Sequence, residues 1–148
     1  MSDYILTIIP EKPYITLSKE QQKQSILYLS QTLQADDIEV KHFTNPEFID
    51  CGQNLEHIYC PQCHQELSFE WWGQAMDHAY QHAFQNLSIC MPCCGNTLSL
   101  DTLDYDAPCG FARIAIVIWN PKDTLSTSQI KQISHIVQCK IKVIHSHL

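Results

Sequence analysis

Apolar residues fill two stretches of the chain almost without interruption, residues 4–9 and residues 111–119. Each stretch is soon followed by a proline, Pro10 after the first and Pro121 after the second. A strand that is apolar on both faces is typical of the middle of a sheet, where other elements cover it on every side. We therefore predict that these stretches are two central strands.

Two other stretches alternate between apolar and polar side chains, residues 38–43 and residues 140–145. A period of two is expected of a strand that has one face in the core and the other in solvent. Both stretches also carry lysine, which discourages the open edge of a sheet from pairing with other chains. We predict that they are edge strands.

A helix start with the same signature follows each apolar stretch. Ser18 and Gln21 have the spacing of a capping box, and so do Ser126 and Gln129. The two starts lie in nine-residue segments that are identical at six positions. We interpret this similarity as structural: a strand–helix–strand unit of the same kind occurs twice in the chain.

Each predicted helix buries one apolar stripe. The first helix is expected to run from Ser18 to about Gln34. The residues expected on the two stripes are Gln22, Ile26, Leu27, Leu29 and Leu33 in the first helix and Ile130, Ile133 and Val137 in the second.

Two such units predict an α+β fold, namely a ferredoxin-like β-α-β-β-α-β sandwich. Its first half would occupy residues 1–44 and its second half residues 110–148. Residues 45–109 are then an insertion between the second and third strands, within one compact domain. Helices cover only one face of such a sheet, although its central strands are apolar on both faces. We expect the insert to cover the other face.

The insert is predicted to begin with a loop, residues 45–52, and to contain a helix at about residues 69–86. One apolar stripe along this helix consists of Trp72, Met76, Ala79 and Ala83. The pair Trp71 and Trp72 is either a plug that seats the insert on the sheet or a hot spot for a partner, and we favour the plug.

Two cysteine knuckles in the insert carry the clearest chemistry of the chain. The first is Cys60-Pro61-Gln62-Cys63, and the second lies within Cys90-Met91-Pro92-Cys93-Cys94-Gly95. Structural zinc takes four ligands at tetrahedral corners, and a two-residue gap lets one tight turn supply two thiolates. The pattern therefore predicts a zinc ribbon with a closed site.

The second knuckle offers three cysteines for two places. Cys90 and Cys93 have the usual two-residue gap. Cys93 and Cys94 are adjacent and precede Gly95, the flexible residue that usually follows the last ligand of a knuckle. Cys90 therefore remains an alternative to Cys94. The ligand set that we favour is Cys60, Cys63, Cys93 and Cys94.

The other cysteines and a histidine pair are predicted to bind no metal. Cys51, Cys109 and Cys139 are expected to be small, buried, apolar side chains. His78 and His82 are four residues apart on the predicted helix, a spacing that could place both on one ion. We interpret them as partly exposed histidines without a ligand.

Acidic residues dominate the insert. The formal net charge is −7, and the stretch between Lys41 and Arg113 holds nine acidic residues and no lysine or arginine. Phosphate backbones are bound through lysine and arginine, so nucleic-acid binding is not expected. Complementary charge favours a basic protein partner instead. The side chains predicted to contact it are Asp77, Asp101, Asp104 and Asp106.

Motifs for catalysis and for membrane insertion are missing from the sequence. The four glycines form neither GxxxxGK nor GxGxxG, and GxSxG does not occur. We therefore assign no catalytic residues and expect a protein that is not an enzyme. No apolar run reaches the length of a membrane helix. Eight cysteines without an export signal favour a reducing compartment, and we expect the protein in the cytoplasm.

Six short segments carry a resemblance to a protein family. They are Phe48-Ile49-Asp50-Cys51-Gly52, Cys60-Pro61-Gln62-Cys63, Trp71-Trp72, Pro92-Cys93-Cys94-Gly95, Gly110-Phe111-Ala112-Arg113 and Asn120-Pro121. On these segments, which span most of the chain, the sequence resembles small bacterial zinc-ribbon proteins, some of them labelled sugar-transporter ATPases. The resemblance favours Cys93 and Cys94 as ligands. The ATPase label has no support here, because the sequence lacks a nucleotide-binding loop.

These observations lead to two hypotheses of different classes. The leading one is a non-enzymatic, zinc-stabilised module that binds a protein, most concretely an immunity protein that neutralises a basic toxin. The alternative is a metal- or thiol-dependent enzyme that uses cysteine and histidine groups of the insert. The alternative requires a metal ion that carries water or a thiol that is reactive.

Overall fold

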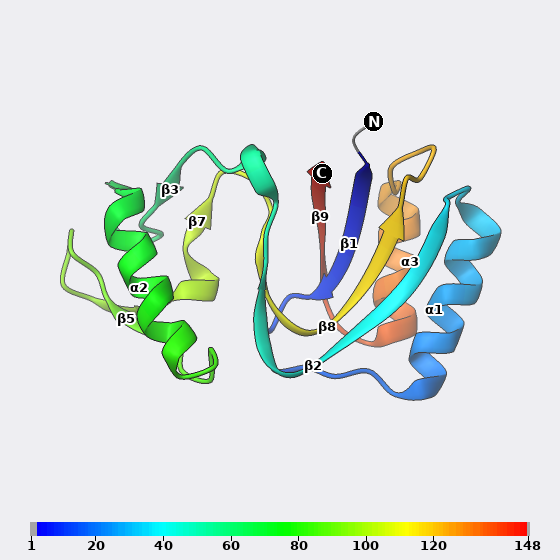
Figure 1. Ribbon diagram of the computed structural model, residues 1–148, viewed down its shortest axis with the longest axis horizontal. Coiled ribbons are helices and arrows are strands. Elements are labelled where there is room, and N and C mark those ends of the chain that lie inside the picture. The colour runs from blue at the N-terminus through cyan, green and yellow to red at the C-terminus, as the bar shows by residue number, and fades with distance from the viewer. Residues whose placement is uncertain (1–2, 148) are drawn as a thin grey trace.

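The computed structural model describes residues 3–147 and has a mixed α+β architecture with antiparallel sheets. Its main sheet has the strand order β2-β8-β1-β9 (Figure 1). Every neighbouring pair in this sheet is antiparallel. The four strands are β1 (Tyr4–Pro10), β2 (Asp37–Ile49), β8 (Gly110–Trp119) and β9 (Ile141–His147). The two strands predicted to be central, β1 and β8, do lie in the middle, because only they are apolar on both faces.

Helices α1 (Lys19–Thr32) and α3 (Thr127–Val137) pack side by side on one face of the sheet (Figure 1). Both predicted capping boxes are present. The hydroxyl of Ser18 accepts from the Gln21 amide at 3.1 Å, while Gln21 Oε1 accepts from the Ser18 amide at 2.9 Å. Ser126 and Gln129 repeat these contacts at 3.2 and 2.8 Å. Such caps satisfy amides that have no partner inside the helix, and each contributes about 1 kcal/mol.

The core between sheet and helices contains most of the residues predicted on the two stripes, although Ile26 and Leu27 are not part of it. Leu29 and Ile133 are fully buried against Leu6 and Ile118 of the central strands. Full burial of each such side chain contributes about 1.5–3 kcal/mol. Leu27, predicted to widen the stripe of α1, is instead 58% exposed, because a helix turns by about 100° per residue and so places it almost opposite the buried Leu29; Tyr28 packs against this core instead.

Strand β2 is longer than predicted. Residues 45–49, expected to be part of a loop, continue the strand after a bulge between His42 and Glu47. Glu47, Phe48 and Ile49 pair with the first residues of β8. The predicted boundary of the insert at residues 44–45 therefore falls inside β2.

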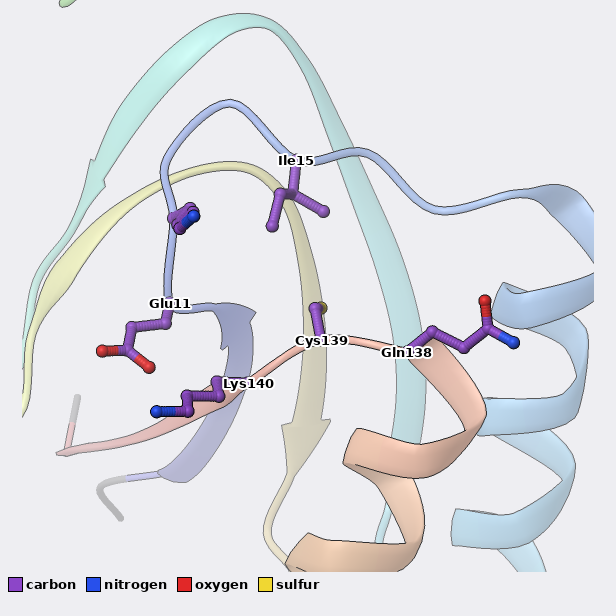
Figure 2. Close-up of a pocket in the computed structure, with 6 residues that line it drawn as sticks. Glu11, Ile15, Gln138, Cys139 and Lys140 are labelled. Atoms are coloured by element: carbon purple, nitrogen blue, oxygen red, sulfur yellow. The ribbon is translucent and has the colours of Figure 1, made fainter.

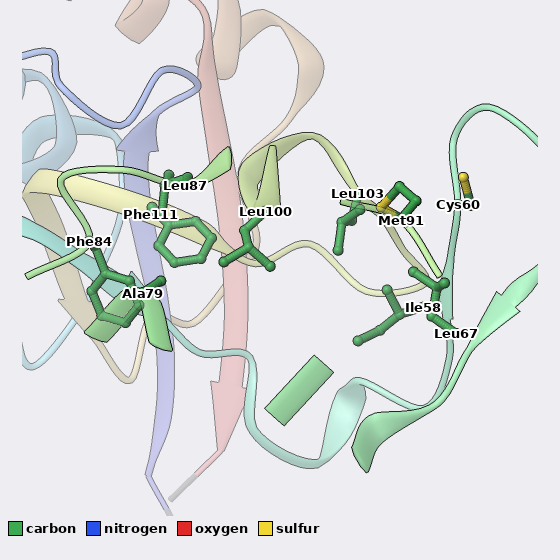
Figure 3. Packing of buried hydrophobic residues seen from close by; sticks show 10 residues of the cluster. All are labelled: Ile58, Cys60, Leu67, Ala79, Phe84, Leu87, Met91, Leu100, Leu103 and Phe111. Atoms are coloured by element: carbon green, nitrogen blue, oxygen red, sulfur yellow. The ribbon is translucent and has the colours of Figure 1, made fainter. Parts of the chain in front are cut away.

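The insert is built of short elements. It contains α2 (Phe69–Gln81) and the small sheets β4-β3-β7 and β5-β6. The strands are β3 (Ile58–Tyr59), β4 (Glu66–Leu67), β5 (Ser88–Cys90), β6 (Thr97–Ser99) and β7 (Asp104–Tyr105), and two 3-10 turns are η1 (Gly52–Asn54) and η2 (Leu100–Thr102). A core that includes Ile58, Leu100 and Phe111 joins these elements to the sheet (Figure 3).

Helix α2 ends at Gln81, earlier than the predicted residue 86. Ala83 and Phe84 have φ angles of 56° and 53°, in the left-handed region, so the chain leaves the helix there. The turn directs Phe84 into the core, where its ring centroid lies 5.3 Å from that of Phe111. Burial of this aromatic ring outweighs continuation of the helix.

Residues at the two ends of the insert help to cover the second face of the sheet, as predicted. Ile5, Ala115 and Val117 on that face form one buried cluster with Cys51 and Cys109, which lie at the two ends of the insert. In Figure 1 the insert lies on the side of the sheet opposite α1 and α3.

Trp72 packs where α2 faces the sheet. Its ring lies 5.7 Å from that of Phe48 in β2, and its Nε1–H donates to the Tyr105 hydroxyl at 3.2 Å. These contacts favour the interpretation of Trp72 as a plug.

Within residues 3–147 there is no helix with the length and apolarity needed to cross a membrane.

Candidate metal centre

Four thiols converge at the end of the insert. Cys60 and Cys63 come from the turn between β3 and β4, and Cys93 and Cys94 come from the turn between β5 and β6. Their sulfur atoms all lie within 4.8 Å of one another. Cys63 Sγ is 3.2 Å from Cys93 Sγ, and Cys60 Sγ is 3.9 Å from Cys94 Sγ. Sulfur atoms around a tetrahedral zinc with bonds of about 2.3 Å lie about 3.8 Å apart. The four cysteines can therefore hold a metal ion.

The two turns have the same backbone hydrogen bonds. In the first, the Cys60 amide donates to the Gln65 carbonyl at 2.9 Å, and the His64 amide donates to the Cys60 carbonyl at 2.8 Å. In the second, the Met91 amide donates to the Asn96 carbonyl at 2.9 Å, and the Gly95 amide donates to the Met91 carbonyl at 3.0 Å. Each turn is thus a six-residue knuckle closed at both ends.

This equivalence sets the register of the ligands. Met91 stands in the second knuckle where Cys60 stands in the first, and Cys94 stands where Cys63 does. Met91 is 1% exposed and belongs to the core of the insert, so its side chain packs rather than binds (Figure 3). Cys93, one residue before Cys94, supplies the fourth thiol. Cys90 precedes the knuckle, is exposed, and donates weakly to the Gly95 carbonyl at 3.7 Å.

The knuckle that contains Cys60 favours a negatively charged sulfur. Backbone amides of Cys63 and Gln62 point at the Cys60 thiol and lower its pKa to about 7. The neighbouring thiols, that of Cys63 first among them, raise the pKa of Cys93 to about 12. A divalent cation would displace the remaining thiol protons, so metal binding at this cluster is expected to release protons.

The remaining cysteines lie apart from the cluster. Cys51 and Cys109 are each 1% exposed, and burial raises the pKa of both thiols. Cys139 is half-buried and borders a hollow of about 530 Å³ between the residues after β1 and the end of α3 (Figure 2). Burial raises its pKa as well, which makes it a poor nucleophile.

His78 lies on α2 and His82 directly follows it as the C-cap residue; their ring centroids are 5.2 Å apart, and both side chains are exposed. Neither residue is among the groups of three or more metal-ligating side chains found in residues 3–147.

Asp77 is exposed on α2, and Asp101 is half-buried in η2. Asp104 is exposed on β7, and Asp106 follows that strand. The four acids predicted to contact a partner thus come from separate elements of the insert.

A second group of possible ligands was missed by the sequence analysis. Glu56, His57 and Asp106 are exposed, with ligand atoms within 4.8 Å of one another. His57 Nδ1 also lies 3.1 Å from Glu66 Oε2, and this contact raises the pKa of the histidine. Only the adjacency of Glu56 and His57 is visible in the sequence, because Asp106 reaches them through the pairing of β3 with β7.

Comparisons of this chain with protein-family models, with curated proteins and with solved structures found no match.

Proposed function

We propose that the four-cysteine cluster binds one zinc ion and that the protein is a zinc-stabilised, non-enzymatic module for binding another protein. Four thiolates fill the tetrahedral positions of zinc, which leaves none for a catalytic water. The ligands lie on two turns that are separated by α2, so the ion would connect both halves of the insert. A reducing cytoplasm would keep these thiols available for metal.

The fold that we propose for the main sheet is the ferredoxin-like sandwich. Numbered by their order among the four long strands, the strands lie in the sequence 2-3-1-4, and all neighbours are antiparallel. Both helices pack on one face, as that arrangement requires. The zinc-bearing insert then belongs between the second and third strands.

The observation that carries the functional proposal is the charge of the insert. Nine acidic residues and no lysine or arginine occur between Lys41 and Arg113. A zinc ion bound by four thiolates leaves a net charge of about −2 at the cluster and adds to this field. Such a surface attracts a basic protein and repels nucleic acid. A basic toxin neutralised by this chain is the most concrete partner.

Affinity capture tests this proposal. The tagged, zinc-loaded protein is incubated with a lysate of its own cells, and retained proteins are identified by mass spectrometry. The control carries Asp77→Asn, Asp101→Asn, Asp104→Asn and Asp106→Asn, which remove charge and keep hydrogen-bond acceptors. We expect one stoichiometric basic partner with the wild type, and reduced retention by the control. Capture of no partner, or equal retention of an acidic one, would refute the proposal.

A metal-dependent enzyme is the second candidate, and one observation favours it. The Glu56, His57 and Asp106 group offers three ligands in an exposed position that leaves room for water. Hydrolysis of ester or phosphoester substrates that is abolished by His57→Ala, while the zinc of the cysteine cluster is retained, would support this candidate. Full activity in that variant would eliminate this group as its active site.

A further inference from the structure

Two thiols that the metal centre does not use lie where the insert joins the main sheet. Cys51 follows the end of β2, and Cys109 directly precedes β8. Ile49 and Gly110 are partners at this end of the two strands, and both cysteines lie just beyond that pair. Neighbouring strands are about 4.8 Å apart, and a disulfide joins Cα atoms about 4.4–6.8 Å apart, so chain segments that continue from this pair are within its reach.

Both side chains belong to the same core. Each is 1% exposed, and together they share one buried cluster with residues of the second face of the sheet. Burial raises the pKa of Cys51, and a hydrogen bond from the Cys109 thiol partly offsets this increase. The register of the strands, the shared cluster and this contact all place the two sulfur atoms next to each other.

This pair of thiols does not form a second metal centre. Structural zinc takes four ligands, and only two thiols meet here. Within the described residues 3–147, neither Cys51 nor Cys109 belongs to a group of three or more metal-ligating side chains. The chemistry that remains open to two adjacent thiols is formation of a disulfide.

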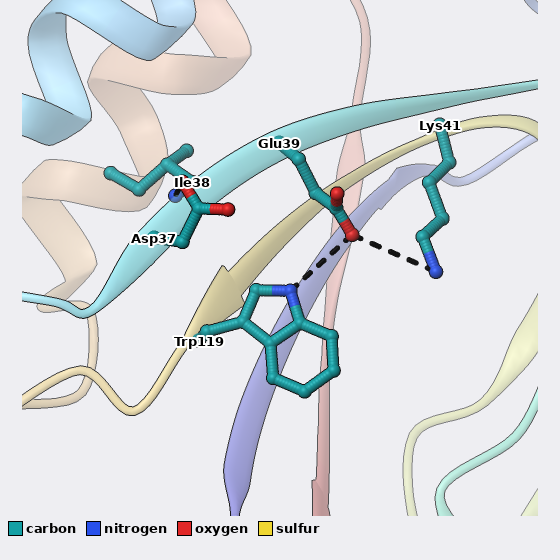
Figure 4. Close-up of polar contacts among 5 residues, drawn as sticks. All are labelled: Asp37, Ile38, Glu39, Lys41 and Trp119. Carbon is teal, nitrogen blue, oxygen red and sulfur yellow. Dashed lines mark hydrogen bonds and ion pairs between the residues drawn. The ribbon is translucent and has the colours of Figure 1, made fainter.

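A link between these residues would act on the whole insert. The opposite end of the same strand pair is fastened by side chains, because Trp119 Nε1–H donates to Glu39 Oε1 at 3.3 Å (Figure 4). At the end that carries the cysteines, β2 and β8 lead into the insert (Figure 1). A covalent bond between Cys51 and Cys109 would close a loop that contains both knuckles of the metal centre.

We propose that Cys51 and Cys109 form a disulfide that fastens the insert to the sheet under oxidising conditions. The oxidant is a small-molecule disulfide, such as oxidised glutathione. The thiolate of Cys51 attacks one of its sulfur atoms, and one glutathione leaves as a thiolate. The thiolate of Cys109 then attacks the sulfur of Cys51, and the second glutathione leaves. Two protein thiols are oxidised, one glutathione disulfide is reduced, and the two leaving thiolates take up the two protons.

Burial controls how fast this exchange proceeds. Thiols that are excluded from solvent are inert while the structure is closed, so the exchange proceeds through local opening of the junction. The same burial shields the disulfide from reductants once the junction has closed again. The inference does not rest on the proposed function, because it involves neither the zinc cluster nor a partner.

Mass spectrometry tests the inference on the full, zinc-loaded chain. Reduced protein is incubated with a mixture of oxidised and reduced glutathione, and excess zinc protects the four thiols of the cluster. The remaining thiols are then blocked with N-ethylmaleimide in denaturant, and the protein is digested with chymotrypsin. We expect one pair of linked peptides that contains Cys51 and Cys109, with the cysteines of the cluster blocked.

Matched variants separate this link from oxidation elsewhere. Cys51→Ala and Cys109→Ala each remove one partner, whereas Cys90→Ala removes an exposed thiol of the insert. Oxidation should raise the urea midpoint of the wild type and of Cys90→Ala by about 1 M or more, because the link restricts the unfolded chain. The midpoints of Cys51→Ala and Cys109→Ala should not respond to oxidation.

Three results would overturn the inference. The first is absence of the Cys51–Cys109 peptide pair under conditions in which the exposed Cys90 carries glutathione. The second is a link that forms in urea but not in the folded protein. The third is an equal rise of the urea midpoint in Cys51→Ala, which would assign the effect to other cysteines.

Discussion

Met91 occupies in the second knuckle the position that Cys60 occupies in the first. In both cases the amide of the residue donates to the carbonyl five positions later, and its carbonyl accepts from the amide four positions later. Both side chains are buried, at 0% exposure for Cys60 and 1% for Met91. Two identical turns thus provide thiols at different places, the first and fourth residues in one turn and the third and fourth in the other.

This register predicts that substitutions of Cys90 and of Cys94 have different outcomes. Cys94→Ser should lose zinc, whereas Cys90→Ser should keep one equivalent, because Cys90 lies outside the cluster. Structural zinc sites bind with roughly 10–16 kcal/mol, so loss of about a quarter of that free energy lowers the affinity roughly a hundredfold or more. Zinc content measured by elemental mass spectrometry after dialysis against a weak chelator separates the two variants. Equal zinc in both, or loss from Cys90→Ser alone, would show that the second knuckle uses the other ligand pair.

The turn geometry makes a second prediction. His64 and Gly95 hold equivalent positions with φ angles of 64° and 72°, in the left-handed region that favours glycine. We expect Gly95→Ala to lower the free energy of unfolding by about 1 kcal/mol and His64→Gly to raise it by up to about 1 kcal/mol. The control is Gly73→Ala, within α2, which should stabilise by about 0.5–1 kcal/mol. Urea unfolding with excess zinc measures all three. Destabilisation by His64→Gly would show that the histidine side chain stabilises the knuckle in another way.

Local patterns predicted the elements of the main sheet well. Ser18 and Ser126 could be identified as helix caps because a capping box depends on residues only three apart. The strand positions followed from apolar periodicity, which directly reflects burial on one face or both. A cluster of four thiols on two short turns was also foreseeable, although the choice between Cys90 and Cys94 stayed open.

Features that depend on distant contacts were not foreseeable. Phe84 ends α2 because its ring reaches Phe111, and β2 continues because Phe48 packs on the same ring. Cys90 and Cys93 have an orthodox gap, yet the turn begins at Met91, and only the hydrogen bonds reveal this. The side-chain amide of Asn120 donates to both Asp3 and Asp36, which the sheet brings together from separate parts of the chain.

A hydrogen-bonded tyrosine in the insert makes a third prediction. Tyr105 donates to the Leu100 carbonyl at 2.7 Å and accepts from Trp72 Nε1 at 3.2 Å. Tyr105→Phe leaves both partners unsatisfied next to the core and should lower the free energy of unfolding by about 1–3 kcal/mol. Tyr80→Phe is the control, since Tyr80 is 71% exposed and its loss should change stability by less than about 0.5 kcal/mol. Similar urea midpoints for the two variants would contradict the expected role of Tyr105.

A buried thiol predicts how stability changes in alkali. Cys109 is 1% exposed, and burial raises its pKa above the ordinary value of 9.0. The native state therefore keeps this proton while the unfolded chain loses it, so the stabilising contribution is complete at pH 7 and declines as pH rises above about 9. One such group contributes a slope of at most about 1.4 kcal/mol per pH unit.

Cys109→Ala should remove that part of the slope, measured by urea unfolding between pH 7 and 10.5 with excess zinc. Cys90→Ala, which removes an exposed thiol, should keep the wild-type slope. An unchanged slope in Cys109→Ala would mean that this thiol ionises equally in both states.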